Sequence, residues 1–539
     1  MGNPVRRPAA AHLSLRDSII TGTGTGLIAV YVVAVGIVPS VATRMIVAPW
    51  LSLATVVLIG IFFGAGVVVG RGPGGSPLAR IVSAVVVGLV AGMIYIGLML
   101  LAQKLRLQAT LVSLTPATLQ IALFSRSSAE AWLMGLAITT AASLAGLGFA
   151  VAPPRLRATI RAATLALLAV ALLRDIWVPL LRLVPGGRAI NLWVYSGTGL
   201  SVSGALIIAA VTAALQVALN RLDPSPGRRL FGTVLLVALA ALLPLVTSPF
   251  VAQVLLLVAL YSLMGIGLNI ELGLAGLLDL GFVAFFAIGA YVTALLTAGS
   301  PLAVADLGFW AALPIAVAAA AVGGFIFGLP VLRVRGDYLA LATLGLGEIV
   351  RLLVGSDMLA STIGGAQGII GVPRPEVGTF SLTSQIQLYY LALILTVLAG
   401  LVCHWLEHSA IGRAWKAARE DEDVAVALGL DLVGSKLRAY VIGAAVAGIS
   451  GALFATMLGS VFPQSFQLTV SINVLALLVV GGLGSLPGVF VGSLVLIGLP
   501  EFLREFGEFR YLLYGFLLIL VMRFRPEGLW PAQLQSTKA

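Results

Sequence analysis

The sequence is poor in charge, in histidine and in cysteine. Only 10% of its 539 residues are charged, whereas 60% are hydrophobic, and it contains three histidines and one cysteine. The single cysteine, Cys403, excludes an intrachain disulfide and a cysteine metal cluster. Apolar runs of roughly 20 residues, the length that spans a bilayer as a helix, recur from end to end. The sequence therefore predicts an all-α, polytopic transmembrane helical bundle.

The positive charge of the chain is concentrated in its first part. Residues 1–229 contain 18 Lys and Arg against 4 Asp and Glu, whereas residues 230–539 contain 14 against 17. These basic residues are spread over short loops, as expected when Lys and Arg are retained on the cytoplasmic side of a membrane. No dense basic run with interleaved aromatics occurs, so we expect membrane lipid as a partner and no nucleic acid.

Hydropathy and loop signals divide the chain into two parts. The strongest break is the Pro-rich and Gly-rich stretch 223–229, which coincides with the change in charge balance. We therefore expect an N-terminal membrane extension at 1–229 and a second part at 230–539. Apolar segments of the first part are expected near 19–38, 46–70, 80–103, 129–152, 158–181 and 197–219. Those of the second part are expected near 231–247, 250–270, 276–298, 309–330, 338–355, 386–405, 438–460, 472–498 and 509–523.

The stretch 407–438 is a charged island in this apolar chain. Its eleven charged side chains cannot lie in hydrocarbon, since each centrally placed charge costs roughly 2.5–3.5 kcal/mol on an insertion scale. The pattern predicts a helix from Ile411 to Leu428 that ends at Gly429. An ordinary solvated loop helix is one interpretation. Trp415 favours a face that contacts a partner, because large aromatics anchor interfaces.

Two motifs in or near this island suggest enzymes. His404, Glu407 and His408 match the H-x-x-E-H pattern of inverted zinc peptidases, but the remaining histidine is His12 and no third ligand is evident. Residues 429–436 resemble a phosphate-binding loop, but Ser and Lys stand in the wrong order and no strand precedes them. We therefore expect no metal, no cofactor and no ATP binding by this chain, with a membrane zinc peptidase kept as an alternative of another class.

Polar residues stand in or at the end of apolar segments at Asn269, Glu271, Asp279 and Glu348. Three of them, Asn269, Asp279 and Glu348, are candidates for a translocation path. Ionisable groups within a membrane are functional candidates because they are expensive to bury. Each also has a structural interpretation. Asp279 is suited to cap a helix, and Glu348 to pair with Arg351 three residues later.

The run G-G-L-G-S-L-P-G at 481–488 lies within a predicted apolar segment. It lacks the strand–turn–helix setting of a dinucleotide site. We expect instead a helix break or re-entrant turn, which membrane proteins tolerate where neighbouring protein satisfies the backbone. The residues expected to form the break are Gly481, Gly482, Gly484, Pro487 and Gly488.

Several motifs resemble one known family in order and approximate spacing over about 245–530. They read YSLMGIGLN at 261–269, GLAGLLDLG at 273–281, RGDYLALATLG at 335–345, GRAWKAAREDE at 412–422, GGLGSLPG at 481–488 and RPEGL at 525–529. Together they resemble the LivM-type permease of branched-chain amino acid ABC importers. The resemblance implies an ABC permease core at 230–539 and a multi-pass position in the inner or plasma membrane of a prokaryote.

The resemblance also implies a cytoplasmic coupling helix at 412–429, which docks on an ATPase subunit and links hydrolysis there to alternating access here. Its implied partners are a second related permease, two ABC ATPase subunits and an extracytoplasmic substrate-binding protein. The implied coupling residues are Gly412, Arg413, Trp415, Lys416, Arg419, Glu420, Asp421, Glu422 and Gly429.

Two features depart from the family pattern. Val470 stands where the family often has an acidic residue, just before Ser471, and residues 1–229 exceed the family core. The expected cargo is leucine, isoleucine, valine or a related small amino acid. Urea and short-chain amides remain an alternative cargo, and a stand-alone secondary transporter remains an alternative mechanism.

Overall fold

The computed structural model describes residues 15–532 except 43, 73–75, 106–112, 125–127, 184–186, 198, 220–241, 246, 332–333, 335–336, 379, 505–506 and 508. The chain forms two compact units, Met1–Pro226 and Gly227–Ala539. The boundary expected between 229 and 230, and most of the apolar segment expected at 231–247, lie outside the described residues.

The N-terminal unit is built from helices that pack closely through glycine. α3 packs on α6, and α4 packs on both α1 and α6. A Cβ atom at Gly66 of α3 would lie 1.8 Å from the Ser143 carbonyl oxygen of α6, so only glycine allows this approach. The elements are α1 (Leu15–Ala34), α2 (Ile37–Val41), β1 (Met45–Val47), β2 (Leu51–Ser52), α3 (Leu53–Arg71), α4 (Pro77–Lys104), α5 (Pro116–Ala122), α6 (Ser128–Val151), α7 (Pro154–Leu172), α8 (Arg174–Leu183), α9 (Gly187–Val194), β3 (Tyr195–Ser196), β4 (Gly199–Leu200) and α10 (Val202–Leu219).

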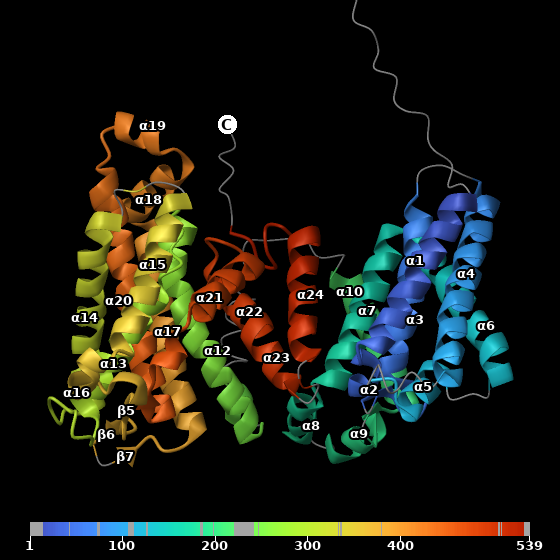
Figure 1. Ribbon diagram of the computed structural model, residues 1–539, viewed down its shortest axis with the longest axis horizontal. Coiled ribbons are helices and arrows are strands. Elements are labelled where there is room, and N and C mark those ends of the chain that lie inside the picture. The colour runs from blue at the N-terminus through green and yellow to red at the C-terminus, as the bar shows by residue number, and fades with distance from the viewer. Residues whose placement is uncertain are drawn as a thin grey trace, which may run out of the picture. The chain divides into compact units, whose positions relative to one another are not determined.

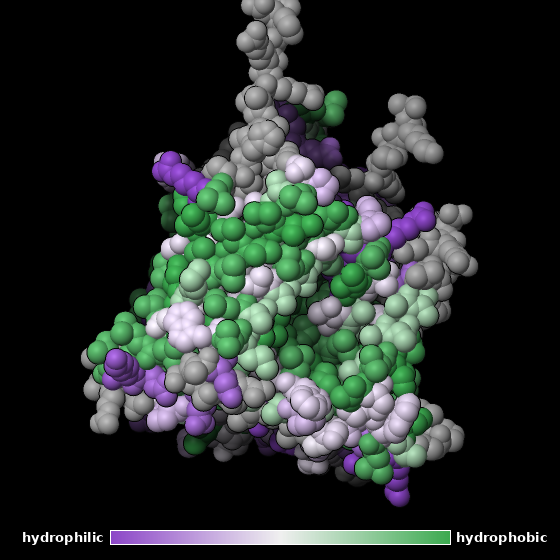
Figure 2. All heavy atoms as spheres, turned by 90° about the vertical axis from the view of Figure 1, so that its right-hand side faces the viewer, coloured by the Kyte–Doolittle hydropathy of each residue, from purple (hydrophilic) through white to green (hydrophobic). Residues whose placement is uncertain are grey.

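The outer surface of this unit is apolar. Leu101 of α4 and Leu133 of α6 are 48% and 78% exposed. The face drawn in Figure 2 shows a broad hydrophobic band, with hydrophilic residues gathered at its edges. A band of this kind suits contact with lipid, because hydrocarbon does not penalise exposed apolar side chains.

Four short strands of this unit pair in the order β2-β1-β4-β3.

The C-terminal unit contains a second helical bundle. Its helices before the charged island are α12 (Pro249–Leu268), the π-helical η2 (Asn269–Leu274), α13 (Val283–Thr297), α14 (Phe309–Val331), α15 (Asp337–Val354), α16 (Ala360–Ile363) and α17 (Gln385–His408). The later helices are α18 (Ala410–Glu420), α19 (Glu422–Ala427), α20 (Leu432–Leu458), α21 (Leu468–Gly481), α22 (Leu486–Ser493), the π-helical η6 (Leu494–Gly498), α23 (Leu499–Phe502) and α24 (Phe509–Phe524).

Short elements lie at one end of this unit, and α18 and α19 lie at the other (Figure 1). The short elements are the 3₁₀ turns η3 (Asp357–Leu359), η4 (Gly365–Gln367) and η5 (Pro463–Phe466), and the strands β5 (Ile369–Ile370), β6 (Glu376–Val377), β7 (Phe380–Ser381) and β8 (Ser460–Val461). β5 pairs with β8, and β6 pairs with β7.

α20 is the central helix of the C-terminal bundle and packs against α12, α13 and α14. Small residues allow these close contacts, as is usual between helices in a membrane. A Cβ atom at Gly289 of α13 would lie 2.4 Å from the Gly448 carbonyl oxygen of α20. The Ser450 hydroxyl of α20 donates a hydrogen bond to the Leu260 carbonyl of α12 at 3.0 Å.

The architecture confirms the predicted fold class. Among the described residues, eight helices are long and apolar enough to cross a membrane, or up to eleven if each of three bent helix pairs is one span. Each of the eight overlaps an apolar segment expected from the sequence. The bent pairs are Pro154–Leu172 with Ile176–Arg182, Tyr338–Val354 with Asp357–Ile363, and Leu468–Gly481 with Leu486–Phe502, at 86°, 55° and 118°.

Two expectations about helix extent are wrong. The segment expected at 276–298 starts as an irregular turn, and α13 begins only at Val283, because Gly276 has a φ of +74° that ends the preceding helix. The helix expected at 411–428 is two helices. Asp421 lies between them with extended backbone, and its carboxylate accepts hydrogen bonds from the Asp423 and Val424 amides, which starts α19.

Candidate functional site

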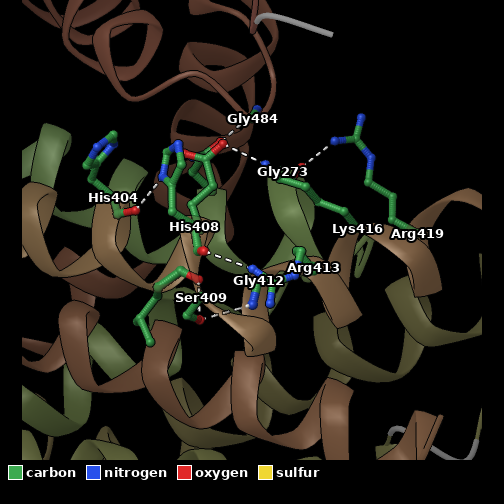
Figure 3. Close-up of polar contacts among 12 residues, drawn as sticks. Gly273, His404, His408, Ser409, Gly412, Arg413, Lys416, Arg419 and Gly484 are labelled. Carbon is green, nitrogen blue, oxygen red and sulfur yellow. Dashed lines mark hydrogen bonds and ion pairs between the residues drawn. The ribbon is translucent and has the colours of Figure 1, made fainter. Parts of the chain in front are cut away.

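α18 crosses tightly over the end of α17. Ser409 joins the two helices: its hydroxyl donates to the Leu406 carbonyl at 2.7 Å and accepts from the Gly412 amide at 3.4 Å. A Cβ atom at Gly412 would lie 2.3 Å from the Leu406 carbonyl oxygen, so the crossing requires glycine. The Arg413 guanidinium donates to the His408 carbonyl at 3.1 Å, one of the contacts drawn in Figure 3. The direction of α18 is thus set by the last turn of α17.

Trp415 faces the bundle, which corrects the expectation that it lies on a partner-binding face. Its side chain is fully buried, and its indole N–H donates to the Ser435 carbonyl of α20 at 2.8 Å. α18 is amphipathic, and its apolar residues are buried against the bundle while its charged residues face outward. Trp415 therefore anchors α18 to α20.

The outward surface of α18 and α19 combines charged and apolar side chains. Glu422 forms an ion pair with the buried Lys436 of α20, which connects α19 to the bundle. Apolar side chains of α19 and its end are exposed, with Val424 at 54% and Leu428 at 78%. Gly429, with a φ of +85°, ends this segment. We name the following exposed residues the docking face, after the partner contact that the resemblance implies for this segment: Arg413, Lys416, Glu420, Asp421, Val424, Val426 and Leu428.

Arg419 links α18 to two irregular segments of the bundle. Its guanidinium donates a hydrogen bond to the Gly273 carbonyl, which belongs to η2 (Figure 3). Its side chain also lies against Gly276 and Gly484: Cβ atoms built there would be 3.0 Å from its Cγ and 3.6 Å from its Nη1. Arg419 is thus the residue through which α18 contacts both the π-helical end of α12 and the break at 481–488.

Asn269 connects the same two segments from inside the bundle. It is 1% exposed, and its side-chain oxygen accepts a hydrogen bond from the Gly484 amide at 2.9 Å. The structure therefore brings together two groups of residues expected separately from the sequence, a path candidate and a helix break. π-helical turns are frequent at functional sites, and η2 begins at Asn269.

The glycine-rich run forms the sharp bend between α21 and α22. Gly482 and Gly484 adopt φ angles of +124° and +79°, which glycine allows without strain. Gly481 and Gly488 pack face to face, since a Cβ atom at Gly481 would lie 2.0 Å from the Gly488 carbonyl oxygen. Pro487 lies in the first turn of α22, where its missing N–H leaves no hydrogen bond broken.

A buried polar cluster lies beside these breaks. Glu271 of η2 is fully buried and Asp279 is 1% exposed, and both Glu271 oxygens and one Asp279 oxygen have no hydrogen-bond partner among the described residues. Glu271, Thr343 and Tyr440 surround the Asp279 carboxyl. The other Asp279 oxygen accepts from the Gly281 amide at 2.6 Å. Buried carboxyls with so few partners are costly, which makes them candidates for a functional site.

α15 and α20 each pack closely against the segment that carries the cluster. The Thr343 hydroxyl of α15 accepts from the Leu280 amide at 3.0 Å. A Cβ atom at Gly443 of α20 would lie 2.1 Å from a Glu271 oxygen, so Gly443 makes room for that carboxyl. The turn that carries Asp279 is thus held between two spanning helices.

Glu348 differs from Asn269 and Asp279. It forms an ion pair with Arg351, with one N–O distance of 3.0 Å, and the two side chains are 42% and 30% exposed. Its partner in the described structure is therefore its own helix neighbour, which matches the structural interpretation of this residue.

Three members of the buried cluster were not among the site residues expected from the sequence: Glu271, Thr343 and Tyr440. Glu271 carries a usable signal, because an acidic residue in an apolar segment is itself uncommon. Threonine and tyrosine within apolar helices are too common to single out. Their role is visible only once α12, α15 and α20 are packed together.

Comparisons with known proteins agree with this architecture. Residues 250–522 match the model of the family "Branched-chain amino acid transport system / permease component". The chain is 39% identical over 368 residues to the high-affinity branched-chain amino acid transport system permease protein LivM of Escherichia coli K12, covering 63% of this chain and 85% of the relative. LivM of Salmonella typhimurium is likewise 39% identical, over 58% of this chain and 77% of the relative.

A different permease of the same kind of system is also similar. The permease protein LivH of Escherichia coli K12 is 27% identical over 289 residues, which are 50% of this chain and 90% of the relative. No solved structure matches the chain.

The fold and these similarities define a multi-pass membrane permease subunit. The chain belongs to the family of branched-chain amino acid transport system permease components.

Proposed function

We propose that this chain forms the translocation path of an ATP-driven importer of branched-chain or related small amino acids. In this proposal a second permease, similar to LivH, pairs with the chain, and two ATPase subunits bind on the cytoplasmic side. A substrate-binding protein delivers the amino acid from the other side. The similarity to both LivM and LivH supports a pair of related permeases, because the two named relatives belong to one kind of transport system.

The observation that carries the coupling role is the position of Arg419. It belongs to the helix that exposes the docking face, and it hydrogen-bonds Gly273 at the π-helical end of α12. A partner that moves α18 would pull on this contact first. Since Asn269 ties the same turn to Gly484, the movement would reach the bend between α21 and α22 as well.

The tight crossing at Gly412 and the buried Trp415 hold α18 rigidly against α17 and α20. A helix fixed at one end by the Ser409 turn and along its inner face by the Trp415 indole moves as a unit with α17 and α20. Alternating access by small shifts of packed helices fits this arrangement better than loosening of a single loop. The buried cluster of Glu271, Asp279 and Tyr440 lies next to the moving turn, and we assign it to the gate of the path.

Transport by purified components tests the proposal. The chain would be reconstituted in liposomes with its second permease, ATPases and binding protein, and uptake of labelled leucine and labelled urea would be compared. We expect ATP-dependent leucine uptake that stops when the ATPases are omitted. Uptake of urea but not leucine would contradict the proposed cargo and support a urea permease. Leucine uptake without the ATPases would contradict the proposed mechanism and support secondary transport.

The zinc peptidase alternative has little support from the geometry. An inverted zinc peptidase needs the glutamate of H-x-x-E-H as a free base. Here Glu407 forms an ion pair with Lys416 at 2.9 Å, at the exposed end of a helix rather than in an enclosed site. Family membership as a transport permease points the same way.

A further inference from the structure

The last turn of α17 gathers two imidazoles and a carboxyl that the permease function does not use. His404, Glu407 and His408 follow the i, i+3, i+4 spacing that places side chains on one helix face. One ligand atom from each lies within 4.8 Å of the other two. Both histidines are exposed and Glu407 is half-buried, so all three can be reached from solvent.

The hydrogen bonding of His408 prepares this group to bind a metal. His408 Nδ1 lies 2.8 Å from the His404 carbonyl oxygen. A carbonyl oxygen only accepts, so Nδ1 carries a proton, and in the neutral imidazole Nε2 is then the nitrogen that can bind a metal. Metal-binding histidines usually donate their second N–H to a carbonyl or carboxylate in this way, which fixes the ring. The two rings lie close together, with centroids 4.3 Å apart, as Figure 3 shows.

Glu407 has a competing partner on the neighbouring helix. Its carboxylate accepts a hydrogen bond from the Lys416 ammonium of α18 at 2.9 Å, and the Lys416 side chain is 45% exposed. A cation bound by Glu407 would repel this ammonium, and an exposed ion pair of this kind is weak because water screens it. Lys416 is therefore easily displaced into solvent.

We propose that His404, Glu407 and His408 form a binding site for a zinc-class divalent transition metal, and that metal and Lys416 compete for Glu407. Two imidazoles and one carboxylate suit zinc, copper or nickel, whereas magnesium and calcium prefer oxygen ligands. Ligands about 2.0–2.2 Å from a tetrahedral ion lie about 3.3 Å apart. Small rotations of exposed side chains bring the three atoms to that spacing, and water completes the coordination.

This site is not a catalytic one, because Glu407 binds the ion and is not free to act as a base. Its consequence rests on the proposed function: a bound ion frees Lys416 from α17 and changes how α18 is held. Zinc binding itself is measured on the chain without any ATPase. Its failure would therefore leave the coupling role untouched, and failure of the coupling role would leave the site untouched.

Zinc titration of the purified full-length chain in detergent, carrying no polyhistidine tag, tests the site. We expect one zinc ion per chain, no competition from excess magnesium, and loss of the site in His404→Ala/His408→Ala. Each single substitution should weaken binding by at least about tenfold, the loss that removal of even an outer partner of a metal ligand often brings. His12→Ala, which removes the remaining histidine of the chain, should bind zinc as the unaltered chain does.

The competition is tested with a matched pair of charge variants. Lys416→Gln frees Glu407 and should tighten zinc binding, whereas Arg438→Gln removes one positive charge from α20 and should leave the affinity unchanged. Zinc binding of full affinity in the double histidine variant, or equal affinities in Lys416→Gln and Arg438→Gln, would overturn the proposal.

Discussion

The two units of this chain are similar in hydropathy but differ in regularity. The N-terminal unit contains long spanning helices such as α4 and one helix pair bent by 86°. Its buried Ser143 hydroxyl donates to the Ala84 carbonyl at 2.9 Å, whereas the buried Thr140 hydroxyl has no partner among the described residues. The C-terminal unit contains two π-helical segments, a 118° bend and buried carboxyl oxygens without partners. Buried carboxyls are expensive in a membrane, and those without partners among the described residues belong to the C-terminal unit, which supports the proposal that the translocation path lies there.

The family match covers the same unit. The family model spans residues 250–522, which contain the bend, the buried cluster and the docking face. The similarity to LivM of Escherichia coli K12 covers 63% of the chain, which is more than the C-terminal unit Gly227–Ala539, so it extends into the N-terminal unit. The two units differ in how their apolar segments fold. Among the described residues, the N-terminal unit has one bent helix pair, whereas the C-terminal unit has two bent pairs and two π-helical segments, and Arg419 contacts one of each.

The largest expected effect compares two buried aromatic residues, one in each unit. Trp415 and Tyr95 are both fully buried and both donate to a carbonyl, Ser435 and Ala122 respectively. Trp415→Ala and Tyr95→Ala should each destabilise the chain by about 3–5 kcal/mol, measured by thermal unfolding in detergent. We expect co-purification of the ATPases to be lost in Trp415→Ala and retained in Tyr95→Ala. Loss of ATPase co-purification in both variants would mean that the effect of Trp415→Ala reflects general destabilisation and not a contact made by α18.

The next effect concerns the crossing of α17 and α18. Gly412→Ala places a Cβ atom 2.3 Å from the Leu406 carbonyl oxygen, whereas Gly400→Ala on α17 meets only the tip of Ile266 at 3.9 Å. We expect leucine uptake in liposomes to fall at least about tenfold in Gly412→Ala, equivalent to 1.4 kcal/mol of lost coupling, and to remain normal in Gly400→Ala. Equal uptake in the two variants would mean that the direction of α18 is unimportant.

The third prediction compares buried polar groups. Asp279→Asn and Glu271→Gln keep the shape of each side chain but remove its ability to ionise, and each should reduce the initial rate of uptake by about tenfold, or about 1.4 kcal/mol in the barrier. Ser143→Ala, in the N-terminal unit, removes one hydrogen bond worth about 0.5–1.5 kcal/mol of stability and should leave the rate unchanged. Unchanged rates in Asp279→Asn and Glu271→Gln would assign the cluster to structure alone.

The smallest effect is expected at Glu348. Its ion pair with Arg351 is partly exposed, and such pairs contribute about 0–1 kcal/mol. Glu348→Gln should therefore keep its uptake rate and lower the thermal midpoint only slightly. A strong loss of uptake in this variant would place Glu348 on the path together with Asp279.

The sequence predicts the membrane spans and the charged island because hydropathy and charge are local properties. The direction in which Trp415 points is not local: it depends on whether α20 or a partner covers the apolar face of α18. The break at Asp421 follows a common helix-capping pattern. Because three neighbouring residues are also acidic, the sequence does not show which of them caps α19. The cluster of Glu271 and Tyr440 depends on residues far apart in the chain that meet only when α12 and α20 pack together.

The most direct test of the coupling account is the number of ATP molecules hydrolysed per leucine imported by reconstituted transporters with and without Arg419. Arg419→Ala removes the hydrogen bond to Gly273 but leaves the docking face in place. We predict that the ATPases still bind and hydrolyse ATP while uptake falls, so that the ratio rises at least about tenfold, or 1.4 kcal/mol of lost coupling. An unchanged ratio, with normal uptake, would contradict the role assigned to this contact.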